Sequence, residues 1–270
     1  MSNLTTPRVT FEVEDGVALM TLNRPDKLNS LDIPLMDDMR AIYAHVNENT
    51  AIRALVTTGN GRGFCTGADL AAAPAAGNAN MTPGQRLAQM MQDYFNPVVR
   101  DLQSLRVPTV AALNGIVAGG GVGLALAHDI VVGAKSADFR VNFTPRLAIV
   151  PDMGSTWFLP RLIGPARAMG LSAFGDKLPA QTAAEWGLIW QCVDDEQLQA
   201  HARELGRRLA KGSTGAYRRL REGIARAQVH DLDNQLDWER DVQGERLDTA
   251  DSQEGVMAFL QKREPKFTGS

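Results

Sequence analysis

The feature that most constrains this chain is a pair of glycine-dense turns. The first spans residues 61–70 (GRGFCTGADL) and the second spans 114–124 (NGIVAGGGVGL). Each follows an apolar run typical of a strand and leads into a segment typical of a helix, whose first N–H groups have no partner within the helix. Because glycine has no Cβ, the backbone there can approach a ligand closely. If the turns converge, two main-chain N–H groups can hold one developing oxyanion, which indicates acyl chemistry rather than phosphate binding.

Strand-type and helix-type segments alternate along the first part of the chain. Alternating apolar residues at 9–13 and 17–22, split by Asp15-Gly16, predict a β-hairpin. Helical spacing predicts a helix over 34–47 with one apolar face, made of Leu35, Met36, Met39, Ile42, Tyr43 and Val46. This alternation predicts an α/β core, because apolar faces of both periods must pack against one another.

The remaining segments extend the same pattern. Further strands are expected at 54–58, 107–113 and 129–134, and the first two run into the two glycine turns. A helix over 85–105 is expected to kink at Pro97. Residues 71–84 indicate a loop, and from about Pro165 the chain is almost entirely of helical type.

Composition excludes several classes of function. The chain has 270 residues, 44% of them hydrophobic and 22% charged, which suits a soluble globular enzyme. A net charge of −3 does not favour nucleic acid as a partner. The N-terminus has no apolar signal-peptide region, and no apolar run approaches the ~18 residues of a membrane span. Two cysteines and four scattered histidines indicate a reducing cytoplasmic setting and no metal site.

Several motifs, in order and with plausible spacing, resemble the crotonase (enoyl-CoA hydratase/isomerase) superfamily. They are the two glycine turns, 22–31 (LNRPDKLNSL) and the C-terminal stretch 254–267. The resemblance covers almost the whole chain and implies an α/β fold built as a spiral of ββα units. It implies that residues 1–195 form the core with an acyl-CoA site, and that 196–270 form a helical C-terminal oligomerisation region. The implied partners are a coenzyme A thioester as substrate, with no cofactor, and further copies of the chain in a homotrimer or a dimer of trimers.

The resemblance also assigns binding residues. The two oxyanion donors map to the backbone N–H groups of Ala68 and Gly120, which would stabilise an enolate more than the starting thioester. Arg24 and Lys27 are expected near the coenzyme A phosphates, and Lys262 near the coenzyme A of a neighbouring subunit; solvated loop charges are the alternative for Arg24 and Lys27. Phe143 and Trp157 are expected to wall the acyl pocket, although aromatic residues more often pack in a core.

The chain departs from the hydratases of the superfamily, which use two glutamates. Gly123 stands at the position of the first, and 142–146 (NFTPR), where the second is expected, contains no acid. Asp152 matches an acid of the superfamily's isomerases instead. A buried carboxyl with a raised pKa can take a proton and return it. The alternative is that Asp152 caps the next helix, but with both glutamates missing we expect catalysis.

The expected function is therefore an acyl-CoA isomerase. A narrower resemblance, carried by 94–100 (YFNPVVR), 157–161 (WFLPR) and 185–191 (EWGLIWQ), lies with superfamily isomerases that rearrange a ring epoxide beside the thioester. It also implies a possible Δ3-to-Δ2 double-bond shift. An enoyl-CoA hydratase with repositioned acids, a fatty-acyl Δ3,Δ2-isomerase and a non-catalytic acyl-CoA-binding trimer remain open. Asp69 is expected to cap the helix after it, and Cys65 to pack in the core.

Overall fold

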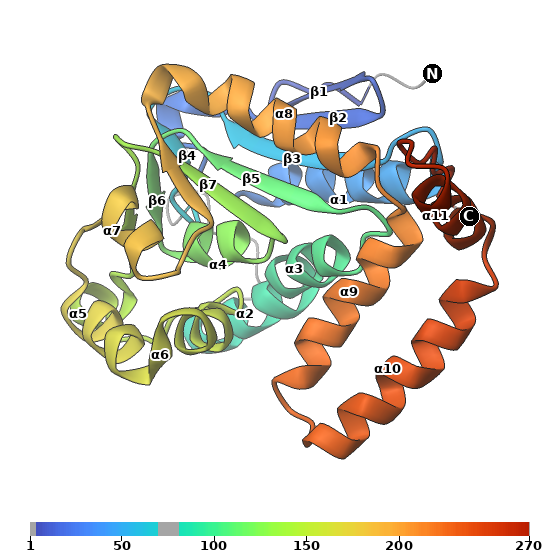
Figure 1. The fold of residues 1–270 in the computed structure, drawn as a ribbon. Helices are drawn as coiled ribbons and strands as arrows, with labels where there is room; N and C mark the ends of the chain where they lie inside the picture. Colours follow the sequence, from blue (N-terminus) through green and yellow to red (C-terminus); the bar gives the residue numbers. More distant parts are fainter. Residues whose placement is uncertain (1–3, 70–80, 270) are drawn as a thin grey trace.

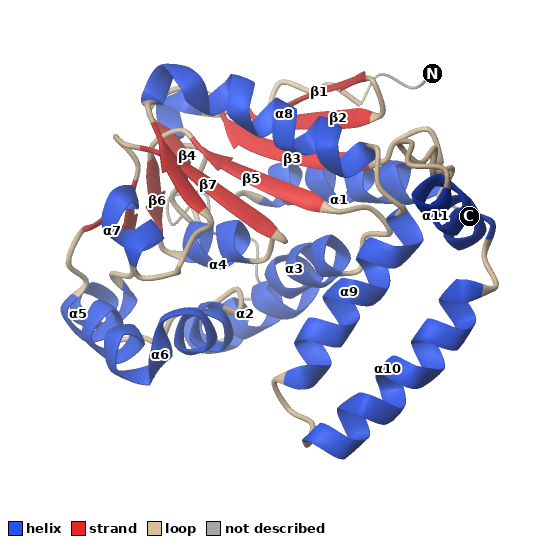
Figure 2. Ribbon diagram, viewed as in Figure 1, coloured by secondary structure: helices blue, strands red, loops and turns tan. Residues whose placement is uncertain are grey.

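Two β-sheets form the centre of the molecule in the computed structural model, which describes residues 4–69 and 81–269. The larger sheet is ordered β1 (Val9–Glu14), β2 (Val17–Leu22), β3 (Ala54–Gly59), β5 (Thr109–Leu113), β7 (Ile130–Ala134) and β10 (Gln191–Val193). The smaller is ordered β4 (Gly63–Cys65), β6 (Ile116–Ala118), β8 (Asp138–Arg140) and β9 (Leu178–Pro179). The predicted hairpin of β1 and β2 is antiparallel, as is the β8–β9 pair, and the remaining neighbours run parallel (Figure 2).

The chain forms a spiral of ββα units, as expected. Each turn places one strand in the larger sheet and the next in the smaller: β3 then β4, β5 then β6, β7 then β8. The helices that follow the strands are α1 (Ile33–Glu48), α2 (Pro83–Met90), α3 (Asn96–Gln103), α4 (Gly120–Leu126), α5 (Phe143–Leu147) and α6 (Ser155–Phe174). Because the strands of the smaller sheet end beside one another, the segments that follow them meet at one edge.

Helix α1 confirms the predicted helix and its buried face. All six apolar residues of its predicted stripe are buried. The carboxyl of Asp32 caps the helix by accepting a hydrogen bond of 2.9 Å from the Leu35 N–H, and Pro34 occupies the first turn, where its missing N–H costs nothing. The start of α1 is therefore anchored on residue 32.

The helix expected over 85–105 is interrupted just before Pro97 by a π-helical turn. Residues Met91–Phe95 form a π-helical turn between α2 and α3, and the Asn96 N–H bonds the Met91 carbonyl five residues back. Because proline cannot donate a backbone hydrogen bond, the helix changes just before Pro97 to bonds that span five residues. Helix α6 consists of two helical segments that meet at Gly164, which has non-helical φ and ψ of 76° and 159°. The second segment begins at Pro165, as expected, and the first, from Ser155, was not predicted.

The C-terminal helices divide into two groups. Helix α7 (Ala180–Glu185) precedes β10, and α8 (Leu198–Ala210) lies across the larger sheet with five buried residues, Leu198, Ala202, Leu205, Gly206 and Ala210. The pair α9 (Thr214–Ala227) and α10 (Leu232–Leu247) projects from the core, and α11 (Ala250–Leu260) follows it (Figure 1). Helix α8 therefore packs on the core, and the division into 1–195 and 196–270 stays a prediction.

None of the described helices is both long and apolar enough to span a membrane.

Candidate active site

The two glycine turns converge at the edge of the smaller sheet. Each glycine-dense segment contains a short strand, β4 in 61–70 and β6 in 114–124, which the sequence pattern did not predict. These strands are parallel neighbours, so the backbone that leaves them, at Gly67 and at Gly119, starts side by side. A β-carbon at Gly67, whose φ is +79°, would lie 2.5 Å from the backbone nitrogen of Gly120. A β-carbon at Gly121 would lie 2.2 Å from the Cys65 carbonyl oxygen. Contacts this short require glycine, and they bring the two main chains together.

Two backbone donors at this junction remain available. Leu31 donates to the Gly67 carbonyl at 2.7 Å and accepts from the Asp69 N–H at 2.9 Å, so the bonds of the first turn flank Ala68 without using its N–H. Gly120 is the first residue of α4, after Gly119 with φ +52° and ψ −136°. Within the described residues, neither the Ala68 N–H nor the Gly120 N–H has a hydrogen-bond partner. Both are free to donate to a ligand atom.

Asp152 lies directly beside the second turn. A β-carbon at Gly120 would be 3.0 Å from its Oδ1. That oxygen is buried and has no hydrogen-bond partner in the described part of the chain. Burial raises the pKa of the Asp152 carboxyl to about 6. The capping alternative is wrong, because Gly154 occupies the N-cap of α6 and no side chain bonds there.

Gly123 has a steric role that the sequence pattern did not reveal. A β-carbon at this position would lie 2.2 Å from the Met153 carbonyl oxygen. Met153 is buried and adopts a left-handed φ of +49°, which turns its backbone onto α4. The loop that carries Asp152 therefore takes the space that any side chain at 123 would need. No local signal marks Met153, since a methionine before glycine has no distinctive pattern.

The two aromatic residues expected in an acyl pocket have different surroundings. Phe143 is buried at the start of α5, and its Cζ would lie 3.8 Å from a β-carbon at Gly119, next to the second turn. Trp157 is 41% exposed on α6, and the guanidinium of Arg161 stacks 4.2 Å from its ring. It lines a cavity of about 530 Å³ between α3 and the start of α6, and Phe143 does not. Both pocket assignments remain predictions.

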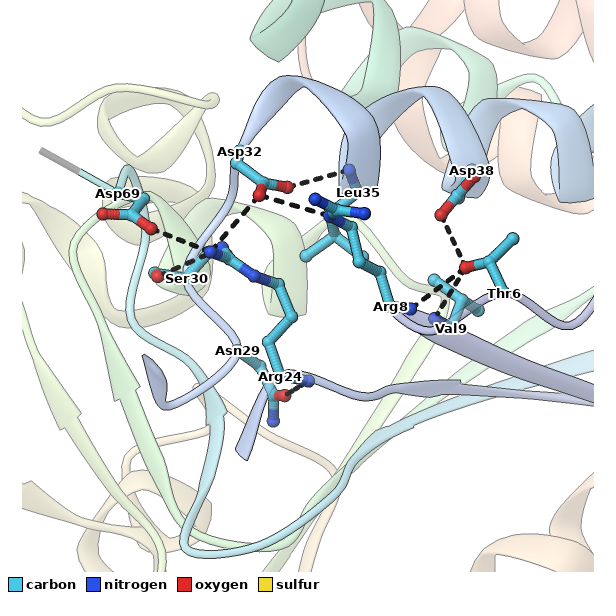
Figure 3. A network of polar contacts seen from close by, with 10 residues as sticks. All are labelled: Thr6, Arg8, Val9, Arg24, Asn29, Ser30, Asp32, Leu35, Asp38 and Asp69. Carbon is cyan, nitrogen blue, oxygen red and sulfur yellow. Dashed lines mark hydrogen bonds and ion pairs between the residues drawn. The ribbon is translucent and has the colours of Figure 1, made fainter. Parts of the chain in front are cut away.

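The three expected coenzyme A ligands differ in their surroundings. The guanidinium of Arg24 pairs with Asp32 and Asp69 and bonds the carbonyl of Ser30 (Figure 3). Lys27 is exposed at the end of a 3₁₀ turn, Pro25–Lys27. Lys262 is exposed just after α11. Helix α11 lies at the opposite end of the molecule from β4 and β6 (Figure 1). Their binding roles remain predictions, and the helix that Asp69 was expected to cap lies outside the described residues.

Other reactive groups near the turns are structural. Burial raises the pKa of the Cys65 thiol to about 12, so it stays protonated at neutral pH and cannot act as a nucleophile. Across residues 4–69 and 81–269, no three histidine, cysteine or carboxylate side chains group in a way that could hold a metal ion. The described residues at the two turns therefore offer two backbone donors and the carboxyl group of Asp152 for chemistry.

The chain is similar over almost its whole length to known proteins. The 1,2-epoxyphenylacetyl-CoA isomerase of Escherichia coli (strain K12) is 45% identical over 258 residues, which cover 95% of this chain and 97% of that protein. A protein described as a probable enoyl-CoA hydratase of Rhodobacter capsulatus is 38% identical over 261 residues, with 97% and 98% covered. The crystal structure of an enoyl-CoA hydratase from Bacillus anthracis superposes with a TM-score of 0.89 at 33% identity, covering 97% of this chain and 100% of that one.

The family model for enoyl-CoA hydratase/isomerase matches residues 12–270. With its ββα spiral and paired backbone donors, the chain belongs to the enoyl-CoA hydratase/isomerase family and is an enzyme of the crotonase superfamily.

Proposed function

We propose that this protein is an acyl-CoA isomerase that moves one proton within its substrate. The observation that carries the proposal is the Asp152 carboxyl beside Gly120: its Oδ1 is buried without a hydrogen-bond partner among the described residues, and its pKa is about 6. Its substrate would be a thioester that is either a ring 1,2-epoxide of phenylacetyl-CoA or a Δ3-enoyl-CoA. The 45% identity to 1,2-epoxyphenylacetyl-CoA isomerase supports the first of these.

The site supports a double-bond shift in two balanced steps. The Asp152 carboxylate takes a proton from C2 of the Δ3-enoyl thioester, and the electron pair of that C–H bond delocalises into a dienolate. The N–H groups of Ala68 and Gly120 donate to the thioester oxygen as its negative charge develops. Asp152 then returns the proton at C4, and the double bond lies between C2 and C3. No water, oxidant or reductant is consumed.

The same geometry disfavours hydration. Adding water across a double bond needs groups that position and deprotonate a water molecule, and hydratases of the superfamily are expected to supply two glutamates. Here Gly123 cannot carry a side chain, because the Met153 carbonyl would lie 2.2 Å from its β-carbon. Helix α5, which covers 143–147, also contains no acid. The Asp152 carboxyl beside Gly120 suits proton transfer between two carbons.

The test compares the wild-type protein with Asp152→Asn on three substrates. Wild type should convert trans-3-hexenoyl-CoA to the 2-enoyl isomer, rearrange the phenylacetyl-CoA ring epoxide, and hydrate crotonyl-CoA poorly. Asp152→Asn should lose about 10²–10⁴-fold in kcat. Asp176→Asn is the matched control, because Asp176 is an exposed aspartate after α6.

Incubation with phenylacetyl-CoA in heavy water adds an independent readout. Wild type should incorporate deuterium at Cα and Asp152→Asn should not. Full turnover by the asparagine variant would refute the role of Asp152. Binding of acyl-CoA without exchange by wild type would favour the non-catalytic alternative, and rapid crotonyl-CoA hydration would favour the hydratase.

We also propose that copies of this chain associate through α9, α10 and α11. The three helices surround a groove of about 1000 Å³ with many exposed apolar side chains, among them Leu220, Ile224, Leu236, Val256, Phe259 and Leu260. Helix α10 has no buried residue of its own in the single chain. Large exposed apolar surfaces of this kind mark protein–protein contacts. A homotrimer or a dimer of trimers would cover them.

A further inference from the structure

Arg24 is held by acceptors on two segments that meet beside the first glycine turn. Its Nη2 lies 2.9 Å from Oδ2 of Asp69 and 3.2 Å from Oδ2 of Asp32, and its Nη1 donates to the Ser30 carbonyl. Figure 3 shows the guanidinium between these three groups. The Arg24 side chain is only 15% exposed, and the two carboxylates are 10% or less exposed. Charge-assisted bonds to a planar guanidinium in such surroundings are strong and directional.

These acceptors flank the proposed donor of the first turn. Asp69 follows Ala68 directly, and Leu31, between Ser30 and Asp32, makes the two backbone bonds to Gly67 and Asp69. Arg24 therefore adds a side-chain link across the same junction that the backbone already bridges at Ala68. Because Asp32 also caps α1, the junction is tied to the start of a rigid helix.

A second link holds the loop of Arg24 to the strand before the turn. Asn29 is fully buried with a left-handed φ of +55°. Its side-chain oxygen accepts from the Arg24 N–H at 2.8 Å, and its amide nitrogen donates to the Gly63 carbonyl at 2.8 Å. The segment 63–69 is thus held at both ends: Asn29 hydrogen-bonds Gly63, and Arg24 pairs with Asp69. Ala68 lies between these two points.

The charge around Arg24 argues against a phosphate ligand. Asp32 also pairs with Arg8, so the two carboxylates are already matched by two guanidinium groups and the cluster has no net positive charge when ionised. A phosphate approaching Arg24 would meet both carboxylates and would have to displace bonds that are already made. Lys27, exposed on the neighbouring 3₁₀ turn, has no such competition from Asp32 or Asp69.

We propose that Arg24 is a positioning residue, which holds the Ala68 N–H in the direction needed to donate to the thioester oxygen. The inference rests on the proposed function, in which that N–H stabilises the dienolate. A displacement of about 1 Å in a catalytic group can cost about 10²-fold in rate. Loss of Arg24 should therefore lower kcat rather than weaken the binding of coenzyme A.

The experiment uses Arg24→Gln, Arg24→Lys and Asp69→Asn with two substrates that share one acyl group. The first is trans-3-hexenoyl-CoA and the second is the pantetheine thioester of the same acid, which lacks the nucleotide and its phosphates. We expect each variant to lose about 10- to 100-fold in kcat on both substrates, with a small change in KM. Arg24→Lys keeps the charge but not the planar fork, so its kcat should also fall. A phosphate ligand would instead raise KM on the coenzyme A substrate alone, and that result would overturn the proposal.

Arg8→Gln is the matched control. Arg8 pairs with the same Asp32 carboxylate at 3.3 Å, but within the described residues it has no bond to Ser30 or Asp69. Its kcat should match wild type. An equal loss in Arg8→Gln would mean that the whole network acts only through stability, and would overturn the assignment to Arg24. Thermal unfolding of each variant shows which are folded, and Arg24→Lys and Asp69→Asn carry the test if Arg24→Gln does not fold.

Infrared spectra of bound phenylacetyl-CoA, labelled with ¹³C at the thioester carbonyl, separate this inference from the proposed reaction. The two N–H donors should lower the carbonyl stretching frequency in wild type, and Arg24→Gln should recover part of the frequency of the free thioester. Asp152→Asn should keep the wild-type frequency, because Asp152 is not a donor to that oxygen. A wild-type shift without isomerase activity would reject the reaction and keep the positioning role. An unchanged frequency in Arg24→Gln would reject the positioning role.

Discussion

At the scale of single residues, the fold shields Oδ1 of Asp152 from water, and no described residue donates a hydrogen bond to it. A carboxyl in such surroundings holds its proton more tightly, which explains its pKa of about 6. A group with this pKa is well matched to proton transfer near neutral pH. The same burial should be visible both in activity and in stability.

The pH dependence of activity is the first prediction. Asp152 must be ionised to accept the proton from C2, so kcat/KM should rise as the pH passes through about 6 and level off above it. Initial rates on trans-3-hexenoyl-CoA from pH 4.5 to 8.5 measure this profile. A rate that is flat across this range would exclude Asp152 as the base of a rate-limiting proton transfer.

The free energy of unfolding should fall as the pH rises through about 6, whereas activity should rise. The folded-state pKa of Asp152 lies above the ordinary value of 3.8, so the folded protein binds the proton more tightly than the unfolded chain. Ionisation of Asp152 therefore lowers the free energy of unfolding by about 3 kcal/mol at pH 8. This loss of stability disappears as the pH falls from about 6 to below 3.8. Asp152→Asn should unfold at higher urea concentration than wild type at pH 8, with the gap narrowing toward pH 4. A gap that is constant with pH would show that ionisation is not its cause.

Gly123 gives a steric prediction at the same scale. Gly123→Ala would place a β-carbon 2.2 Å from the Met153 carbonyl, so the loop of Asp152 or α4 must move. We expect a loss of about 3 kcal/mol in the free energy of unfolding and a lower kcat. Gly170→Ala in α6 is the control, because nothing lies within 4 Å of its β-carbon. Equal stability of the two variants would contradict the tight contact.

At the scale of elements, Arg221 attaches the projecting helix α9 to the core. Its Nη2 lies 2.6 Å from Oδ2 of Asp129 and 2.8 Å from the Val107 carbonyl, and its side chain is mostly buried. These acceptors lie just before β5 and β7, so one side chain joins α9 to two strands of the larger sheet. Such bonds are costly to break because the buried Val107 carbonyl loses its charged partner and Asp129 loses its ion pair.

Replacing this arginine should therefore loosen the helical hairpin. Arg221→Ala should lower the free energy of unfolding by at least about 2 kcal/mol and speed hydrogen exchange of α9 amides. Arg218→Ala, an exposed arginine one turn earlier in the same helix, should change neither. Identical exchange in the two variants would show that Arg221 does not hold α9 in place.

At the scale of the whole molecule, the apolar groove of α9, α10 and α11 leads to a prediction about assembly. Leu236 is half exposed on the wall of this groove, and the buried Oε1 of Gln235 beside it has no partner among the described residues. Wild type should have the mass of a trimer or a hexamer by light scattering, and Leu236→Glu should shift it toward monomer. Met169→Glu changes an exposed apolar residue on α6, outside the groove, and should leave the mass unchanged. A wild-type monomer would refute the proposed association.

Much of this molecule is readable from local sequence. The period of apolar residues predicts the hairpin, α1 with all six of its buried positions, and the strands before both turns. Glycine at 67, 119 and 121 marks backbone that must pass very close to other backbone. The absence of acid at 123 and 142–146 makes Asp152 the candidate base. These features could be predicted because the residue types and their spacing along the chain indicate them directly.

Other features were decided by the tertiary structure. Arg24 meets Asp69, 45 residues later, only because the ends of two ββα turns come together, and Met153 blocks Gly123 only because its loop folds onto α4. The burial that raises the pKa of Asp152 arises in the same way. Sequence by itself determined which residue types were available for the chemistry. The fold determined which of them meet and which lose their water, because contact and desolvation depend on distances in space that separation along the chain does not specify.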